Sequence, residues 1–140
     1  MFPKLRRKRG ADVPEHDVED LARRGYTCSQ IIMMMTMRWM GIEDEYMVRA
    51  VKGLTMGMGI GHACGIVTGA ACALSLAHGA RGMSELFPLF HRWFYERFGE
   101  PCGGINCMDL LDGDIGSHMR VCPDMIMDSW ENVLELLERQ

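Results

Sequence analysis

The stretch GMGIGHACGIVTGAACALSLAHG, residues 57–79, decides how the rest of the chain is organised. It contains no Lys, Arg, Asp or Glu, and small residues recur in it at four-residue spacing: Gly57, Gly61, Gly65, Gly69, Ala73 and Ala77. Residues four apart lie on the same face of a helix, so the stretch predicts a helix with one ridge almost free of side chains. Another backbone can pack closely on such a ridge. We therefore expect a buried central helix, with Cys64 beside the ridge as either the centre of the chemistry or a small core side chain.

The same uncharged stretch raises the question of a membrane span. Its strongly helical part, residues 63–77, is shorter than the roughly 20 apolar residues that a bilayer requires. Near the N-terminus, the paired arginines Arg6 and Arg7 are not followed by the apolar segment of an export signal. We expect a cytoplasmic protein with no membrane span.

Length and charge predict one domain without a general polyanion-binding surface. The 140 residues suffice for one buried core, and the net charge is -4. Residues 4–9 are basic, but acidic residues follow them at once. We expect residues 1–12 to form a flexible basic tail, residues 13–140 to form a single domain, and the chain to bind no nucleic acid.

Helix start and stop signals divide this domain into helical segments. Thr27 or Ser29 caps a helix that ends before Gly41, Pro88 is an alternative start for an aromatic helix, and Pro123 suits the first position of the last helix. The helices expected in chain order cover residues 15–24, 28–40, 43–52, 63–77, 84–98, a short segment from about 107, and 123–137. No segment alternates as a strand does. The sequence predicts an all-α fold, a compact bundle of about five to seven helices around the central Gly/Ala-rich helix.

Six cysteines in a chain without a secretory signal indicate metal or redox chemistry more than a disulfide framework. Four of them, Cys28, Cys64, Cys107 and Cys122, fall at or near predicted helix starts, where free backbone N–H groups favour a thiolate. From this placement we infer that several helix N-termini converge on one site. Cys72 lies eight residues beyond Cys64 on the same helix, about 12 Å away by the helical rise, which is too far for a disulfide. We assign Cys72 to packing.

The cysteine spacing argues against some classes of site, and two further candidate ligands remain. The chain has no Cys-x-x-Cys pair, which argues against a zinc ribbon and a thioredoxin-type motif, and no Cys-x-x-Cys-His for attached haem. Cys102 is a reserve ligand close to Cys107. His62 is a substitute ligand, a proton relay or simply a solvent-facing side chain.

Three motifs together resemble a known family. GYTCSQ at residues 25–30, GMGIGHACGIVTG at 57–69 and NCMDLL at 106–111, with the later Cys122, resemble the C_GCAxxG_C_C family of proteins proposed to be redox-active. The resemblance covers residues 18–138 and implies a small helical protein whose four characteristic cysteines are Cys28, Cys64, Cys107 and Cys122. The chain is also similar to the non-haem part of split-Soret cytochromes, for which an iron-sulfur cluster has been suggested. It departs from the pattern in having Ile66 after Gly65, and in the extra Cys102.

These observations predict an electron-transfer module that binds a 4Fe-4S or 2Fe-2S cluster through Cys28, Cys64, Cys107 and Cys122. One alternative is a thiol-disulfide protein with Cys64 as a low-pKa nucleophile and another of the four as the resolving thiol. The other is a scaffold stabilised by zinc, which the sequence favours less. The expected partner is another redox protein rather than a substrate, since no hydrolase or nucleotide-binding motif is present. The glycine ridge also makes a homodimer an alternative.

Overall fold

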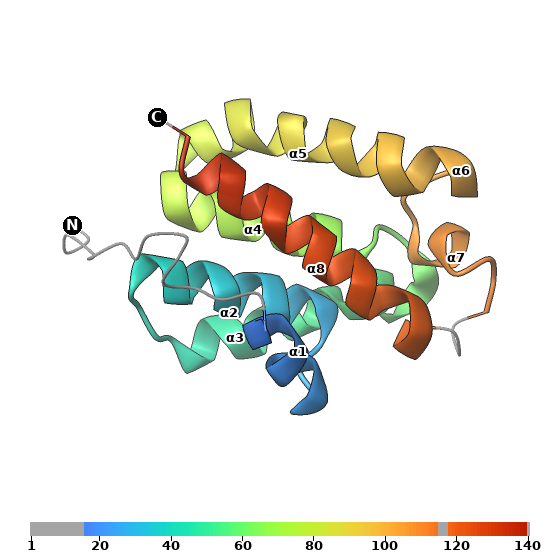
Figure 1. Cartoon of the computed structure of the whole chain (residues 1–140), viewed down its shortest axis with the longest axis horizontal. Coiled ribbons are helices and arrows are strands. Elements are labelled where there is room, and N and C mark those ends of the chain that lie inside the picture. The colour runs from blue at the N-terminus through green and yellow to red at the C-terminus, as the bar shows by residue number, and fades with distance from the viewer. Residues whose placement is uncertain (1–15, 115–117, 140) are drawn as a thin grey trace.

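Helices and short turns account for the residues that the structure describes, which confirms the all-α prediction. Figure 1 shows the computed structural model, which describes residues 16–114 and 118–139. The elements in chain order are α1 (His16–Arg23), α2 (Cys28–Met40), α3 (Glu45–Val51), η2 (Lys52–Leu54), η3 (Gly57–Gly61), α4 (Gly65–His78), η4 (Gly82–Leu86), α5 (Phe87–Phe94), η5 (Tyr95–Gly99), α6 (Glu100–Cys102), α7 (Cys107–Leu110) and α8 (His118–Leu137). Within the described ranges there is no strand, only an isolated antiparallel bridge between Ala63 and Asn106. The predicted tail, residues 1–12, lies outside the described residues, and the single domain of 13–140 stays a prediction.

The central Gly/Ala-rich helix is α4, and α2 packs on its ridge. Ile66, Ala70, Ala73 and Leu74 of α4 are fully buried. A Cβ atom added to Gly69 would lie 3.0 Å from the Cα atom of Ser29 in α2, so glycine is what allows this close approach. The ridge therefore accepts a helix of the same chain, and the homodimer stays a prediction.

The helix expected over residues 63–77 agrees with α4, but the ridge expected to extend N-terminal to it does not form. Gly57 and Gly61 were expected on the ridge, but they lie in the separate turn η3, with φ of 61° and 77°. Such left-handed angles favour glycine and cannot continue a right-handed helix. Small residues recur at every fourth position in both η3 and α4. Only in the regular helix from Gly65 onward does this spacing place them on one packed face.

Both ends of α2 follow from its local sequence. The carboxamide oxygen of Gln30 accepts a hydrogen bond from the backbone N–H of Thr27 at 3.1 Å, so Thr27 is the N-cap. The Ser29 hydroxyl, the alternative cap, is buried and donates to the carbonyl of Val51 at 2.7 Å. Gly41 adopts a left-handed φ of 76° and its N–H donates to Arg38, which ends the helix.

The aromatic helix is longer than expected. It was predicted to run over residues 84–98 and stop at Gly99, with Pro88 as an alternative start. Instead, helical turns continue from Gly82 to Cys102 and stop at Gly103, with φ of 86°. Turns of π type on both sides of α5 shift the hydrogen-bond register, so Pro88 near the start of α5 does not interrupt the helical path.

The last helix also begins earlier than expected. Pro123 was predicted at the first helical position, but α8 begins at His118 and Pro123 lies inside it. Pro123 is the sixth residue of α8, so it removes the hydrogen bond to the carbonyl four residues earlier, and its ring crowds that carbonyl. Farther along α8, Trp130 and Val133 are fully buried in the core.

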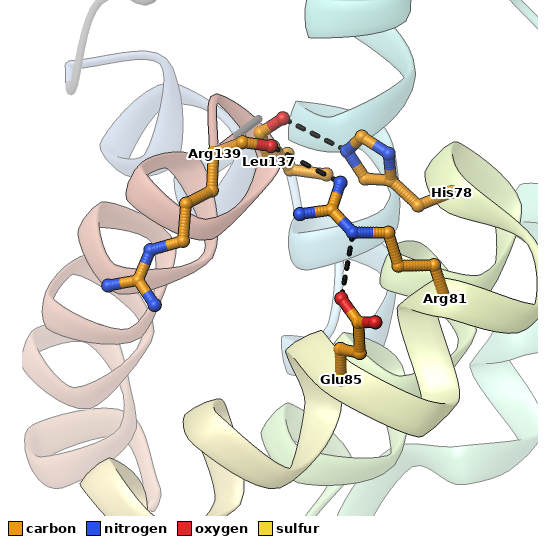
Figure 2. Close-up of polar contacts among 5 residues, drawn as sticks. All are labelled: His78, Arg81, Glu85, Leu137 and Arg139. Carbon is orange, nitrogen blue, oxygen red and sulfur yellow. Dashed lines mark hydrogen bonds and ion pairs between the residues drawn. The ribbon is translucent and has the colours of Figure 1, made fainter.

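The C-terminal ends of α4 and α8 are tied together by polar contacts. Figure 2 shows the imidazole Nε2 of His78 at 2.9 Å from the carbonyl oxygen of Leu137. Beside it, the guanidinium of Arg81 donates to Glu85 at 3.0 Å and to the carbonyl of Arg139 at 3.4 Å. Both helices run toward these contacts in the same direction, so their N-terminal ends lie at the opposite end of the bundle (Figure 1).

Among the helices described, none is long and apolar enough to cross a bilayer.

Candidate functional site

A cavity of about 270 Å³ lies where the N-terminal parts of α2, α4, α7 and α8 meet. All four cysteines that the sequence analysis singled out line it: Cys28, Cys64, Cys107 and Cys122. The remaining lining residues are Ala22, Gly25, Tyr26, Thr27, Ile31, Thr55, Met56, Gly65, Pro123 and Ile126. The structure therefore brings together four sulfurs that are spread over almost the whole length of the chain.

Cys64 and Cys107 are placed by two short segments that pair with each other. The backbone N–H of Cys64 donates to the carbonyl of Ile105 at 2.9 Å, and that of Cys107 donates to the carbonyl of His62 at 2.6 Å. Cys64 is the N-cap of α4 and Cys107 is the first residue of α7. Two separate helix starts are thereby held side by side, and both side chains are buried.

Cys28 and Cys122 complete the wall from α2 and α8, and both are half-buried. Cys28 is the first residue of α2, as expected. Cys122 is not at a helix start, because α8 begins at His118. All four cysteines therefore meet near helix N-termini, as inferred, although Cys122 is the fifth residue of α8 rather than its first.

Gly65, directly after Cys64, leaves room for the sulfur of Cys28. A Cβ atom at this position would lie 2.6 Å from Cys28 Sγ and 2.9 Å from the carbonyl oxygen of Leu54. Any larger residue would have to displace one of them. The glycine is thus part of the cavity wall as well as of the ridge that packs on α2.

The turn before α4 also contributes to the cavity, and sequence reasoning missed it. Thr55 and Met56 line the cavity, and the Thr55 hydroxyl donates to the hydroxyl of Thr27 at 2.7 Å. Gly57 follows with a left-handed φ, and a Cβ atom there would collide with the backbone of His62. The alternating glycines of this stretch were the available signal, and they were assigned to the ridge.

Burial raises the pKa of all four thiols. For Cys64 and Cys28, desolvation raises the pKa more than the backbone N–H groups of the helix starts lower it. For Cys122, desolvation and the neighbouring Cys28 and Cys107 raise the pKa to about 12. Cys107 is raised by desolvation. The protein's own surroundings therefore favour the protonated thiols, which does not support the alternative of Cys64 as a low-pKa nucleophile.

The reserve ligands lie outside the cavity wall. Cys102 and His62 are exposed, and neither lines the cavity. Cys72 is exposed on α4, eight residues beyond Cys64, so it does not pack in the core as we expected. All six cysteines are free thiols. In the part of the chain that the structure describes, no group of three or more His, Cys, Asp or Glu side chains is arranged to hold a metal ion, so metal binding stays a prediction.

Comparison with known families gives one result. Residues 26–136 match the family model described as "Putative redox-active protein (C_GCAxxG_C_C)". The chain belongs to this family. The match confirms the resemblance seen in the sequence, and it includes all four cavity cysteines. Searches of curated proteins and of solved structures found no match.

Proposed function

We propose that this C_GCAxxG_C_C protein is an electron-transfer module whose four cavity cysteines bind an iron-sulfur cluster. The observation that carries the proposal is that Cys28, Cys64, Cys107 and Cys122, from four different helices, line one cavity. Four cysteine thiolates are the usual ligand set of 4Fe-4S and 2Fe-2S clusters. The family description as redox-active agrees with this chemistry.

Two features of the cavity wall support a group held by four sulfurs. Gly65 leaves space for Cys28 Sγ, and the apolar side chains of Ile31, Met56 and Ile126 line the wall between the cysteines. The raised thiol pKa values mean that binding must displace protons, because the thiolate is the ligand. Metal uptake is therefore expected to release protons and to weaken as pH falls.

Backbone N–H groups of two helix starts and of the turn before α4 favour charge on two of the sulfurs. Those of Ile66 and Val67 interact with Cys64, and those of Met56 and Ser29 interact with Cys28. An iron-sulfur cluster supplies one-electron transfer at a potential that hydrogen bonds to sulfur and burial determine. In this chain, these N–H groups and the desolvating wall are the features that would set that potential.

The proposal includes another redox protein as partner and a cytoplasmic location. Besides the four-cysteine cavity, the described residues offer no second set of catalytic side chains. We therefore expect the protein to pass electrons to a partner rather than to transform a substrate itself. Six free thiols suit a reducing compartment.

Anaerobic purification followed by iron, sulfide and zinc analysis and a visible absorption spectrum tests the proposal. We expect a brown protein with iron and acid-labile sulfide, and a Cys72→Ala variant with the same content, because Cys72 does not line the cavity. Stoichiometric zinc without iron would instead support the scaffold alternative. A colourless, metal-free protein whose thiol count depends on redox conditions would support the thiol-disulfide alternative. Either result, or loss of the cluster in Cys72→Ala, would contradict the proposal.

A further inference from the structure

The turn that precedes α4 is left-handed over four consecutive residues. Met56 has φ 55° and ψ 41°, Gly57 has φ 61°, Met58 has φ 62° and ψ 31°, and Gly59 has φ 73° and ψ 1°. For residues with a Cβ atom, this conformation is strained, because the Cβ atom comes too close to the following carbonyl oxygen. Two methionines are therefore held in a conformation that glycine or asparagine would adopt more easily.

The same turn exposes large apolar side chains. Met58 is 51% exposed and Ile60 is 64% exposed. Met108 of α7, 39% exposed, lies against Gly61, so close that a Cβ atom on Gly61 would collide with its side chain. We call Met58, Ile60 and Met108 the turn patch.

Stability alone does not account for the turn patch. Exposing Met58 and Ile60 gains no burial energy, and the left-handed conformation of Met58 has a cost. Local features that oppose stability are typical of functional sites, and adjoining exposed apolar side chains are typical of interaction surfaces. Methionine also adapts its shape easily, which suits a short-lived interface.

The turn patch continues directly into the cavity wall. Met56, at the start of the turn, lines the cavity, and Met108 directly follows Cys107 in the chain. Cys64 is four residues after Ile60. A protein docked on the turn patch would therefore be separated from Cys64 and Cys107 by only a few residues of backbone.

Acidic side chains adjoin the patch on the side of α7. Asp112 and Asp114 are exposed, and the N–H of Gly113 between them donates to the carbonyl of Met108 at 2.8 Å. In an isologous contact between two copies of this chain, these carboxylates would approach each other, and each copy carries a net charge of -4. The charges favour a partner with basic groups around its own contact face.

We propose that the turn patch is the docking surface for a redox partner that presents an apolar face ringed by Lys and Arg side chains. This inference rests on the proposed electron-transfer function. One electron passes between the four-cysteine site and the cofactor of the docked partner, so that one side is oxidised and the other reduced by one electron. No covalent bond forms.

Cytochrome c, which surrounds its exposed haem edge with lysines, is the probe for the test. The rate of its reduction by the anaerobically purified and reduced protein is measured beside the reduction of ferricyanide, a small oxidant that needs no docking face. In a Met58→Ser/Ile60→Ser variant we expect the rate with cytochrome c to fall about tenfold and the rate with ferricyanide to stay unchanged. Asp112→Asn is expected to lower the rate with cytochrome c and its dependence on ionic strength.

A Tyr46→Ser variant is the matched control, because Tyr46 is 80% exposed and lies on α3 rather than in the turn patch. Equal rates with cytochrome c in the wild type and the patch variant, or an equal loss in the control, would overturn the proposal. Methyl NMR signals of Met58, Ile60 and Met108 provide a readout that needs no cluster. If the protein reduces neither oxidant, the electron-transfer function fails. The docking surface then stands only if these signals shift on addition of cytochrome c, and absence of the shift overturns it.

Discussion

The two ends of α4 and α8 are built in opposite ways. At their C-terminal ends, His78 contacts Leu137, and the neighbouring core contains fully buried side chains such as Leu74 and Val133. At their N-terminal ends, the same two helices border a cavity lined by four cysteines, with Cys64 on one helix and Cys122 on the other. One end is filled by apolar side chains and fastened by polar contacts, whereas the other end keeps space between its sulfurs.

The difference separates stability from function within two continuous helices. Filling a core with apolar side chains stabilises a fold, and a cavity lined by desolvated thiols contributes less. The contacts at the far end fasten the C-terminal ends of α4 and α8, away from the four cysteines. We therefore expect substitutions at the cavity end to change metal content, and substitutions at the far end to change stability.

The largest effect expected from the proposed function is loss of the proposed cluster on replacement of one cavity cysteine. A Cys64→Ser variant should lose its iron, sulfide and visible absorption almost completely, because Cys64 lies in the cavity wall between two other helices. The matched control is Cys102→Ser, which removes an exposed thiol outside the cavity. Iron analysis after anaerobic purification measures both. Equal iron content in Cys64→Ser and the wild type would show that the cavity cysteines do not hold the iron.

A substitution in the packed core should destabilise the protein strongly. Trp130 is fully buried in α8, so Trp130→Ala should lower the free energy of unfolding by about 3–5 kcal/mol. Urea denaturation measures this change, and the exposed Tyr46→Ala should stay within about 0.5 kcal/mol of the wild type. A small effect of Trp130→Ala would show that the core is packed less tightly than the structure has it.

Gly65 lies both on the ridge that packs on α2 and in the cavity wall, so its substitution should change both stability and metal content. In Gly65→Ala the new methyl group must displace Cys28 Sγ or the Leu54 carbonyl, which should cost about 1–3 kcal/mol and lower iron loading. Gly53→Ala is the control, because no atom lies near its added Cβ and its φ is not left-handed. Unfolding and iron analysis check both variants. Full iron loading in Gly65→Ala would contradict the assigned position of Cys28.

Alkaline pH should destabilise the cavity end of the reduced, metal-free protein. The pKa of Cys122 is raised from 9.0 to about 12, so above pH 9 the unfolded chain loses this proton before the folded chain does. The stabilising contribution is complete below pH 9 and is lost as pH rises toward 12. Urea denaturation across this range should show a shallower loss in Cys122→Ser than in the wild type. The same slope in both would show that Cys122 does not titrate in this way.

The smallest expected effect is at the far end. His78→Ala removes the contact with the Leu137 carbonyl and should cost about 1 kcal/mol of stability. It should leave iron content and the visible spectrum unchanged, because His78 and Cys64 are at opposite ends of α4. Arg81→Ala, whose partners are exposed, should change stability by less. A loss of iron in His78→Ala would mean that the two ends are coupled.

Local signals in the sequence were sufficient to predict most helix boundaries. They failed where the same residue pattern, such as spaced glycines or a proline, occurs in more than one backbone conformation. Gly41 was correctly predicted as the stop of α2, because a helix C-terminus and a glycine with positive φ are linked within a few residues. Gly57 and Gly61 were expected to extend the helical ridge because their spacing fits it, although the helix was expected only from residue 63, and they lie in a left-handed turn. Pro123 was expected to start α8, because proline is favoured at the first helical position, but it lies inside the helix that begins at His118.

The sequence by itself determined the all-α class, the central Gly/Ala-rich helix and the four cysteines at issue, because periodicity, capping and motif spacing are properties of the chain. Only the tertiary structure decided that Cys28, Cys64, Cys107 and Cys122 face one cavity while Cys102 lies outside it. It also decided that burial outweighs the helix N-termini and raises the thiol pKa values. The physical reason is that side-chain direction and desolvation depend on which helices pack against one another, and these contacts join residues far apart in the sequence.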